Sequence, residues 1–289
     1  MPELPEVETM RTQLEKFLAG STIKDIKVLN NKIINGDVKQ LIGQKIVKVR
    51  RFAKVTSIDF SNSYSILTHV KLTGQYIYRG PKLPQDSILS KKVVGGLGVS
   101  HTHIIFEFTD GGKLYYNDIR KFGWVKVIKS EELKNNNFIK NLGPEPHVAK
   151  GFTGNALTFD YFQNIISKSK RNIKVLLMDQ TKLSGVGNIY ANDALWASGI
   201  SPKRISSSLN KKEQQNLYDE IHRVLKAGLK YGGASELAFV TPDGKEGEYQ
   251  NHTLVYGHQG EICKKCKKTK IEKFFSSGRG TYWCSLCQK

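Results

Sequence analysis

Apolar residues close to the N-terminus recur at the spacing of one helix face. These positions are Val7, Met10, Leu14, Phe17 and Leu18. Pro5 suits the first turn of a helix, where its missing N–H group costs nothing, and Gly20 can end one. The pattern therefore predicts a helix over residues 5–19.

From about residue 22 to residue 128 the pattern changes to short stretches rich in β-branched and aromatic residues. The predicted strands are 46–49, 65–70, 75–78, 104–108 and 124–128. The Asp-Gly-Gly sequence at 110–112 predicts a hairpin turn. Short strands at this spacing are typical of a sandwich or a barrel. His101 and His103 occupy alternate positions of a strand, and we expect both to be exposed on one side of it.

A Gly-Pro-Glu-Pro sequence at residues 143–146 ends the strand region. Residues 157–231 then carry apolar positions at helical spacing, first around Phe162 and again from Leu209 to Leu229. Residues 232–260 are rich in glycine and polar groups and predict a long loop, which a compact domain seldom carries without a use.

These changes of pattern predict an α+β protein of four parts. They are a β-rich domain with an N-terminal helix (1–145), a helical domain (146–231), a loop and connector (232–260) and a small cysteine-containing module (261–289).

Composition narrows the class of protein. With 39% hydrophobic and 10% aromatic residues, a chain of 289 residues can build a core, which excludes a disordered protein. No apolar run approaches the roughly 20 residues that a membrane helix needs. The acidic, proline-rich start does not resemble a signal peptide. We therefore expect a cytosolic protein that does not bind membranes.

The net charge is +19, from 45 Lys and Arg against 26 Asp and Glu. The basic residues cluster over 45–54, 168–174 and 261–289. A lysine-rich proteome would explain the total charge. Clustering instead favours nucleic acid as the partner, because neutralised phosphates release condensed counterions.

All four cysteines lie near the C-terminus, as Cys263, Cys266, Cys284 and Cys287. Two close pairs separated by a short hairpin suit a tetrahedral zinc site. Disulfides are the alternative, but they are rare in cytosolic chains. Four thiolates leave no open coordination position, so we expect one structural zinc ion that folds a hairpin too small to hold a core.

The first eight residues, MPELPEVE, are unusually acidic for so basic a chain. Removal of Met1 would leave Pro2 with a free secondary amine, a group that titrates near ~8. Such an amine can attack a sugar C1′ carbon, and the resulting iminium ion promotes β-elimination of the 3′ phosphate. Glu3 is placed to act as general acid and base. Alternatively, the two residues only start a helix.

Four motifs together resemble one family. They are PELPEVET at 2–9, YNDIRKFG at 116–123, LLMDQTKLSGVGNIYANDALWASGISP at 176–202, and the cysteine hairpin with GRGTYWC at 278–284. In this order they resemble the formamidopyrimidine-DNA glycosylases, bacterial 8-oxoguanine repair enzymes, over residues 2 to 287. The resemblance implies an N-terminal β-sandwich, a helical domain with a helix–two-turn–helix, and a zinc-binding β-hairpin.

The resemblance also implies roles for individual residues. Pro2 matches the nucleophile, Glu3 the catalytic acid, and Lys54 a catalytic-site lysine that contacts phosphate beside the lesion. The residues that match those gripping the DNA backbone are His69, Asn188 and Arg279. Arg120 and Phe122 match two members of a trio that fills the gap left in the duplex, and Glu6 matches a residue that lines the base pocket. Asn188 follows a Gly-Val-Gly sequence and should begin a helix.

The sequence departs from the family pattern at two places. Leu72 stands where the third void-filling residue is usually methionine. Residues 232–250 resemble the family's lesion-capping loop, but their middle, SELAF at 235–239, departs from the usual polar pattern. The loop itself favours this family over the related endonuclease VIII, which prefers oxidised pyrimidines.

The leading hypothesis is a monomeric glycosylase that removes 8-oxoguanine and formamidopyrimidines from duplex DNA and cleaves abasic sites through an imine on Pro2. The alternatives are a protein that binds lesions without cutting, an endonuclease VIII-like glycosylase, and an RNA-associated zinc-ribbon protein.

Overall fold

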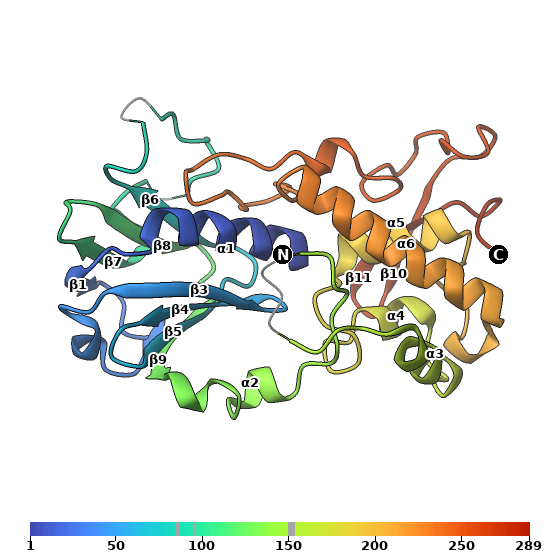
Figure 1. The fold of residues 1–289 in the computed structure, drawn as a ribbon. Helices are drawn as coiled ribbons and strands as arrows, with labels where there is room; N and C mark the ends of the chain where they lie inside the picture. The colour runs from blue at the N-terminus through green and yellow to red at the C-terminus, as the bar shows by residue number, and fades with distance from the viewer. Residues whose placement is uncertain (85–86, 95, 150–153) are drawn as a thin grey trace. The chain divides into compact units, whose positions relative to one another are not determined.

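The computed structural model describes residues 1–84, 87–94, 96–149 and 154–289 (Figure 1). The chain forms two compact units, which are described separately. The first unit holds Met1–Lys140, Ala149 and Leu229–Gln250, and the second holds Asn141–Val148, Gly154–Gly228 and Asn251–Lys289.

The first unit contains two β-sheets. Their strands are β1 (Ile23–Val28), β2 (Ile34–Asn35), β3 (Ile46–Phe52), β4 (Val55–Phe60), β5 (Tyr64–His69), β6 (Gly74–Arg79), β7 (Thr102–Phe108), β8 (Lys113–Asp118) and β9 (Trp124–Lys129). One sheet has the order β1-β7-β8-β6 and the other β2-β9-β5-β4-β3, with antiparallel pairing except between β2 and β9. The predicted sandwich is confirmed, and the five predicted strands correspond to β3, β5, β6, β7 and β9.

A helix completes the core of the first unit. Helix α1 (Leu4–Leu18) buries its apolar face among residues from both sheets. The Phe17 ring stacks on that of Tyr78, with centroids 4.9 Å apart. Short helices η1 (Val38–Leu41), η2 (Ser130–Leu133) and α2 (Asn137–Lys140) flank the strands. The predicted N-terminal helix is therefore confirmed.

The second unit is helical and ends in a β-hairpin. Its helices are α3 (Phe159–Ser167), α4 (Ile173–Leu177), α5 (Asn188–Ser198), η3 (Ser206–Ser208) and α6 (Lys211–Lys230), and its hairpin strands are β10 (Glu272–Ser276) and β11 (Arg279–Trp283). The last two residues of α6 belong to the first unit, and η4 (Tyr249–Asn251) contains the sequence boundary between the units. Helix α5 begins at Asn188, as the Gly-Val-Gly sequence predicts. Across the described part of the chain, no helix has both the length and the apolarity to cross a membrane.

A buried carboxylate attaches the C-terminal module to α5. Asp193 is fully buried and accepts hydrogen bonds from the backbone N–H groups of Leu254, Val255 and Tyr256 at 3.0–3.1 Å. Buried polar groups of this kind are stable only when they are satisfied, so the three bonds fix the connector that leads into the cysteine module on the helix.

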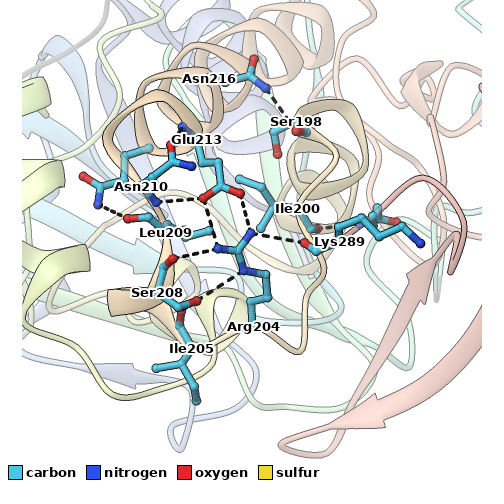
Figure 2. Close-up of polar contacts among 12 residues, drawn as sticks. Ser198, Ile200, Arg204, Ile205, Ser208, Leu209, Asn210, Glu213, Asn216 and Lys289 are labelled. Atoms are coloured by element: carbon cyan, nitrogen blue, oxygen red, sulfur yellow. Dashed lines mark hydrogen bonds and ion pairs between the residues drawn. The ribbon is translucent and has the colours of Figure 1, made fainter.

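Arg204 joins the start of α6 to the C-terminus (Figure 2). Its guanidinium pairs with Glu213 at 2.5 Å and reaches the backbone oxygens of Ser208 and Lys289. Glu213 also forms a reciprocal cap with Asn210, since each side chain accepts the other's backbone N–H. The hydrogen bond from Arg204 lowers the pKa of Glu213.

The expectation that His103 is exposed is wrong. The residue is 3% exposed, and its Nε2 lies 2.7 Å from the backbone oxygen of Asp118 on the neighbouring strand. His101 lies just before β7 rather than within it. The alternation of polar residues did not reveal that the His103 ring has a backbone partner at the end of β8.

The loop of residues 118–123, between β8 and β9, is organised by Asp118. This carboxylate is fully buried and accepts hydrogen bonds from the backbone N–H of Arg120 at 3.2 Å and of Gly123 at 2.8 Å, and from the Thr73 hydroxyl at 2.5 Å. A Cβ atom at Gly123 would lie 2.1 Å from the Tyr116 hydroxyl, so a larger residue cannot fit without displacing that ring.

We therefore predict that Gly123→Ala destabilises the first unit by about 2 kcal/mol or more. Adding Tyr116→Phe should restore about 1 kcal/mol of that loss, because it removes the clashing oxygen. Denaturant unfolding of the single and double variants measures both values. Tyr116→Phe alone is the control, since it removes the oxygen without adding a Cβ atom at position 123. Equal effects of Gly123→Ala with and without Tyr116→Phe would contradict the steric explanation.

Candidate functional site

Pro2 and Glu3 lie at the start of α1, and both are buried. Glu3 is the N-cap residue and forms a capping box with Glu6, in which the Glu3 backbone N–H donates to Glu6 Oε2 at 2.7 Å. The positive end of the helix dipole stabilises carboxylates in this position. The box fixes the backbone directly after Pro2.

Lys54 lies in the tight turn between β3 and β4 and is only 3% exposed. The neighbouring Arg51 donates to the backbone oxygen of Ala53 at 3.0 Å and pairs with Glu8 at 2.7 Å. Because Glu8 belongs to α1, this buried ion pair ties the turn that carries Lys54 to the helix that begins beside Glu3.

His69 is the last residue of β5 and is buried beside the rings of Trp124 and Phe138. Burial, together with the charges of Lys71 and Lys54, lowers the pKa of His69 to about 3. Its Nδ1 accepts the Lys71 backbone N–H at 3.0 Å, which assigns the proton of the neutral ring to Nε2. His69 is therefore an uncharged hydrogen-bond donor at neutral pH.

Arg120 and Phe122 are exposed on the loop that Asp118 organises. Phe122 is 54% exposed, and the Arg120 guanidinium lies 4.7 Å from the centroid of its ring. The Thr73 hydroxyl accepts the Arg120 backbone N–H at 3.0 Å. Leu72 directly precedes Thr73, so this bond places Leu72 next to the loop that carries Arg120 and Phe122.

Glu6 connects the N-terminal end of α1 to the segment 232–250, which we call the capping segment. Glu6 Oε1 accepts the backbone N–H of Ala234 at 2.7 Å, while its other oxygen holds Glu3. Gly233 has φ +85°, and a Cβ there would lie 2.8 Å from the Glu6 side chain. Phe239 belongs to the buried core of the first unit. Phe239, at the end of the stretch that departs from the family pattern, therefore anchors this segment in the core.

In the second unit, Asn188 and Arg279 lie close in the fold. The Asn188 side chain donates to the backbone oxygen of Gly280 at 3.1 Å, directly after Arg279. Lys174 donates to the same oxygen at 3.0 Å and to the Thr281 hydroxyl at 2.7 Å. Arg279 is exposed and borders an open pocket of about 290 Å³ whose other lining residues include Arg171 and Ser277.

Two of the predicted basic clusters contain buried members. Arg51, Lys54 and Lys174 are each at most 3% exposed, and Arg50 pairs with Asp59 at 2.5 Å. These cations contact other groups of the protein, so the exposed basic surface is smaller than the sequence clusters suggested. Arg51, Thr73 and Asp118 are the positioning residues that the sequence analysis missed. Arg51 lies in the basic cluster over 45–54 and Asp118 in the motif at 116–123, but nothing in either stretch distinguished them.

The four cysteine sulfurs lie within 4.8 Å of one another. Two of the separations, Cys263 to Cys287 and Cys266 to Cys284, are 3.8 Å. A disulfide requires about 2.05 Å, so these are free thiols. A tetrahedron with metal–sulfur bonds of about 2.3 Å has edges of about 3.8 Å, so the cluster has the dimensions of a tetrahedral metal site.

The structure thus places the predicted site residues in two sets. The first unit holds Pro2, Glu3, Glu6, Lys54, His69, Leu72, Arg120 and Phe122. The second unit holds Asn188, Arg279, Cys263, Cys266, Cys284 and Cys287.

Comparison with known proteins gives matches over the whole chain. Residues 1–125 match the formamidopyrimidine-DNA glycosylase N-terminal domain, and residues 142–239 match the formamidopyrimidine-DNA glycosylase H2TH domain. The formamidopyrimidine-DNA glycosylase of Lactiplantibacillus plantarum is 38% identical over 297 aligned positions that cover 100% of both chains.

Solved structures of the Lactococcus lactis Fpg protein are similar in fold. Its complex with DNA containing N7-benzyl-Fapy-dG has a TM-score of 0.84 and 30% identity over 100% of both chains. Its complex with DNA containing an abasic site has a TM-score of 0.83 and 31% identity over 99% of both chains. On this evidence, the chain belongs to the formamidopyrimidine-DNA glycosylase family.

Proposed function

We propose that this glycosylase excises 8-oxoguanine and formamidopyrimidines from duplex DNA during base-excision repair and then cleaves the abasic site. The observation that carries the proposal is the N-terminal arrangement, in which the helix that begins directly after Pro2 and the buried Glu3 is joined by the Glu8–Arg51 ion pair to the turn that holds Lys54. The L. lactis complexes with lesion-containing and abasic DNA support the same substrate class.

Pro2, freed of Met1, supplies the nucleophile. Its nitrogen lone pair bonds to C1′ while the electrons of the glycosidic bond leave with the base. The proline nitrogen gives its proton to the Glu3 carboxylate, opening of the sugar ring then gives an iminium ion, and Glu3 returns that proton to the C4′ oxygen. Loss of a C2′ proton expels the 3′ phosphate, a second elimination expels the 5′ phosphate, and water releases the proline.

The neighbouring polar groups hold the DNA backbone around the reacting sugar. Lys54 contributes a charge toward a phosphate, and His69 donates a neutral hydrogen bond through Nε2. In the second unit, Asn188 at the start of α5 is in the position where helix amides bind phosphate, and Arg279 adds a positive charge.

Arg120, Phe122 and Leu72 fill the space vacated by the extruded nucleotide. Extrusion costs a few kcal/mol, and an apolar wedge in the stack offsets part of that cost. The stacking of the Arg120 guanidinium over the Phe122 ring presents both groups together, so that the arginine can meet the orphaned base while the ring enters the stack.

The cysteine cluster holds one zinc ion, which supplies structure and no chemistry to the reaction. The bound metal would fix the hairpin that carries Arg279. The protein acts on DNA as a monomer in the bacterial cytoplasm, at the nucleoid.

Borohydride trapping tests the proposed chemistry. Untagged protein with a confirmed N-terminal Pro2 should form a covalent adduct with a duplex that contains 8-oxoguanine opposite cytosine, and not with undamaged DNA. Glu3→Gln should slow base excision by about 10²–10⁴-fold, because it removes the general acid. Glu15→Gln, near the other end of α1, is the control. If Pro2 is free and no adduct forms on oxidised purines or oxidised pyrimidines, a lesion binder without cutting activity is the better reading.

The pKa of His69 gives a second prediction. The unfolded chain binds a proton at this residue below about pH 6.5, whereas the folded protein does not until about pH 3. Its contribution to stability is therefore complete above pH 6.5 and is lost as the pH falls toward 3, with a slope of up to about 1.4 kcal/mol per pH unit. His69→Gln should flatten the unfolding free energy over this range. A ring that takes up a proton above pH 5 by NMR would contradict the assignment.

Removal of the metal gives a third prediction. Cys284→Ser should lose bound zinc and weaken duplex affinity at least tenfold, about 1.4 kcal/mol, because the hairpin that carries Arg279 loses its fixed shape. Metal analysis and DNA titration of the same samples measure the two effects. Ser285→Ala, at the adjacent position, should retain both properties. Full affinity in a verified zinc-free protein would refute the role of the hairpin.

A further inference from the structure

The capping segment exposes few of its side chains near the catalytic end of α1. From Gly233 to Val240, the exposed residues are Glu236 and Leu237, and Leu237 is 63% exposed. Leu237 therefore presents an apolar surface that is free to contact another molecule. This exposed pair, which we call the segment tip, lies two residues after the contact between Ala234 and Glu6.

The start of the capping segment is fixed by hydrogen bonds. Glu6 accepts the Ala234 N–H at 2.7 Å, Gln250 accepts the Ser235 N–H at 2.8 Å, and the Ser235 hydroxyl accepts the Gly247 N–H at 2.8 Å. Because Glu6 also holds the Glu3 backbone, the segment tip begins beside the proposed catalytic residues.

The far side of the segment tip is fixed to the β6 strand and the core. The Gln75 side chain donates to the backbone oxygens of Ala238 and, at 2.7 Å, of Lys92. Phe239 is buried in the core of the first unit, and the Tyr78 backbone N–H donates to the Pro242 oxygen at 2.7 Å. The segment tip therefore spans two fixed ends.

Lys92, which does not belong to the capping segment, links two parts of that segment, at Ser235 and at Glu246. It lies in the connection between β6 and β7, and its ammonium donates to the backbone oxygen of Ser235 and pairs with Glu246 at 2.7 Å. Ser90, from the same connection, donates to the other oxygen of Glu246 at 2.6 Å. The Lys92 and Glu246 side chains are each about one-third exposed, so the ion pair itself adds at most about 1 kcal/mol to stability. Its main effect is to fix geometry.

We propose that Lys92 is a positioning residue for lesion selection. By holding Ser235 and Glu246 together, it fixes the segment tip beside Glu3 before a base arrives, so that Leu237 meets the damaged base with an apolar surface. A contact made by a prearranged group avoids the entropy cost of ordering the segment when the base binds. This inference rests on the proposed function. It assigns a part in lesion selection to the connection between β6 and β7, which contains none of the four motifs that resemble the family.

Two substrates separate selection from catalysis. A base-contacting segment matters only while a base is present, so an abasic duplex bypasses it. For Lys92→Gln, single-turnover excision of 8-oxoguanine should fall about tenfold while cleavage of an abasic duplex stays within twofold of wild type. Lys91→Gln, at an exposed neighbouring position, should leave both rates unchanged.

Hydrogen exchange on the protein without DNA provides an independent measure. The amides of Ser235 and Gly247 should exchange faster in Lys92→Gln than in Lys91→Gln or wild type, because the link that protects them is lost. Unchanged exchange together with equal rates on both substrates would overturn the proposal, as would an equal loss on both substrates. A wild-type protein inactive on both duplexes would instead overturn the proposed function.

Discussion

The buried ion pair between Glu8 and Arg51 is the contact on which the arrangement of the proposed catalytic residues depends. The two side chains are 6% and 1% exposed, and Glu8 accepts a second hydrogen bond from Arg11 at 3.0 Å. Removing one partner of such a pair leaves an uncompensated charge and typically costs about 3–5 kcal/mol. Here it would also release the β3–β4 turn from α1, so Lys54 would lose its fixed position relative to Pro2 and Glu3.

Buried carboxylates perform a similar task at two other places. Asp118 holds the loop of Arg120 and Phe122, and Asp193 holds the connector that leads into the cysteine module. In each case a short acidic side chain accepts two or more backbone N–H groups that would otherwise need water. These hydrogen bonds give an irregular stretch of backbone one fixed shape, although it forms no strand or helix. The exposed side chains of that stretch remain free for contacts with DNA.

Periodicity and motif order predicted much of the fold. The helix α1, five strands, the start of α5 and the cysteine site followed from local sequence, because each has a short-range pattern. The roles of Arg51, Asp118 and Lys92 could not be predicted in the same way. Their partners lie 43 residues away in sequence for Arg51, 45 for Asp118 and 143 for Lys92, so only the folded chain brings them together. His103 was misjudged for the same reason.

The three tryptophans divide between the units in a useful way. Trp124 lies 6.0 Å from the His69 ring, whereas Trp196 packs in the cluster that contains Cys263 and Cys284. Trp283 lies on β11, with the Lys203 ammonium 4.3 Å from its ring. When light that tyrosine does not absorb is used for excitation, a Trp124→Phe protein therefore emits only from the unit that carries the cysteines, and its difference from the wild-type emission reports on the first unit. Each half of the molecule can thus be followed optically, without a label and in the presence of the other.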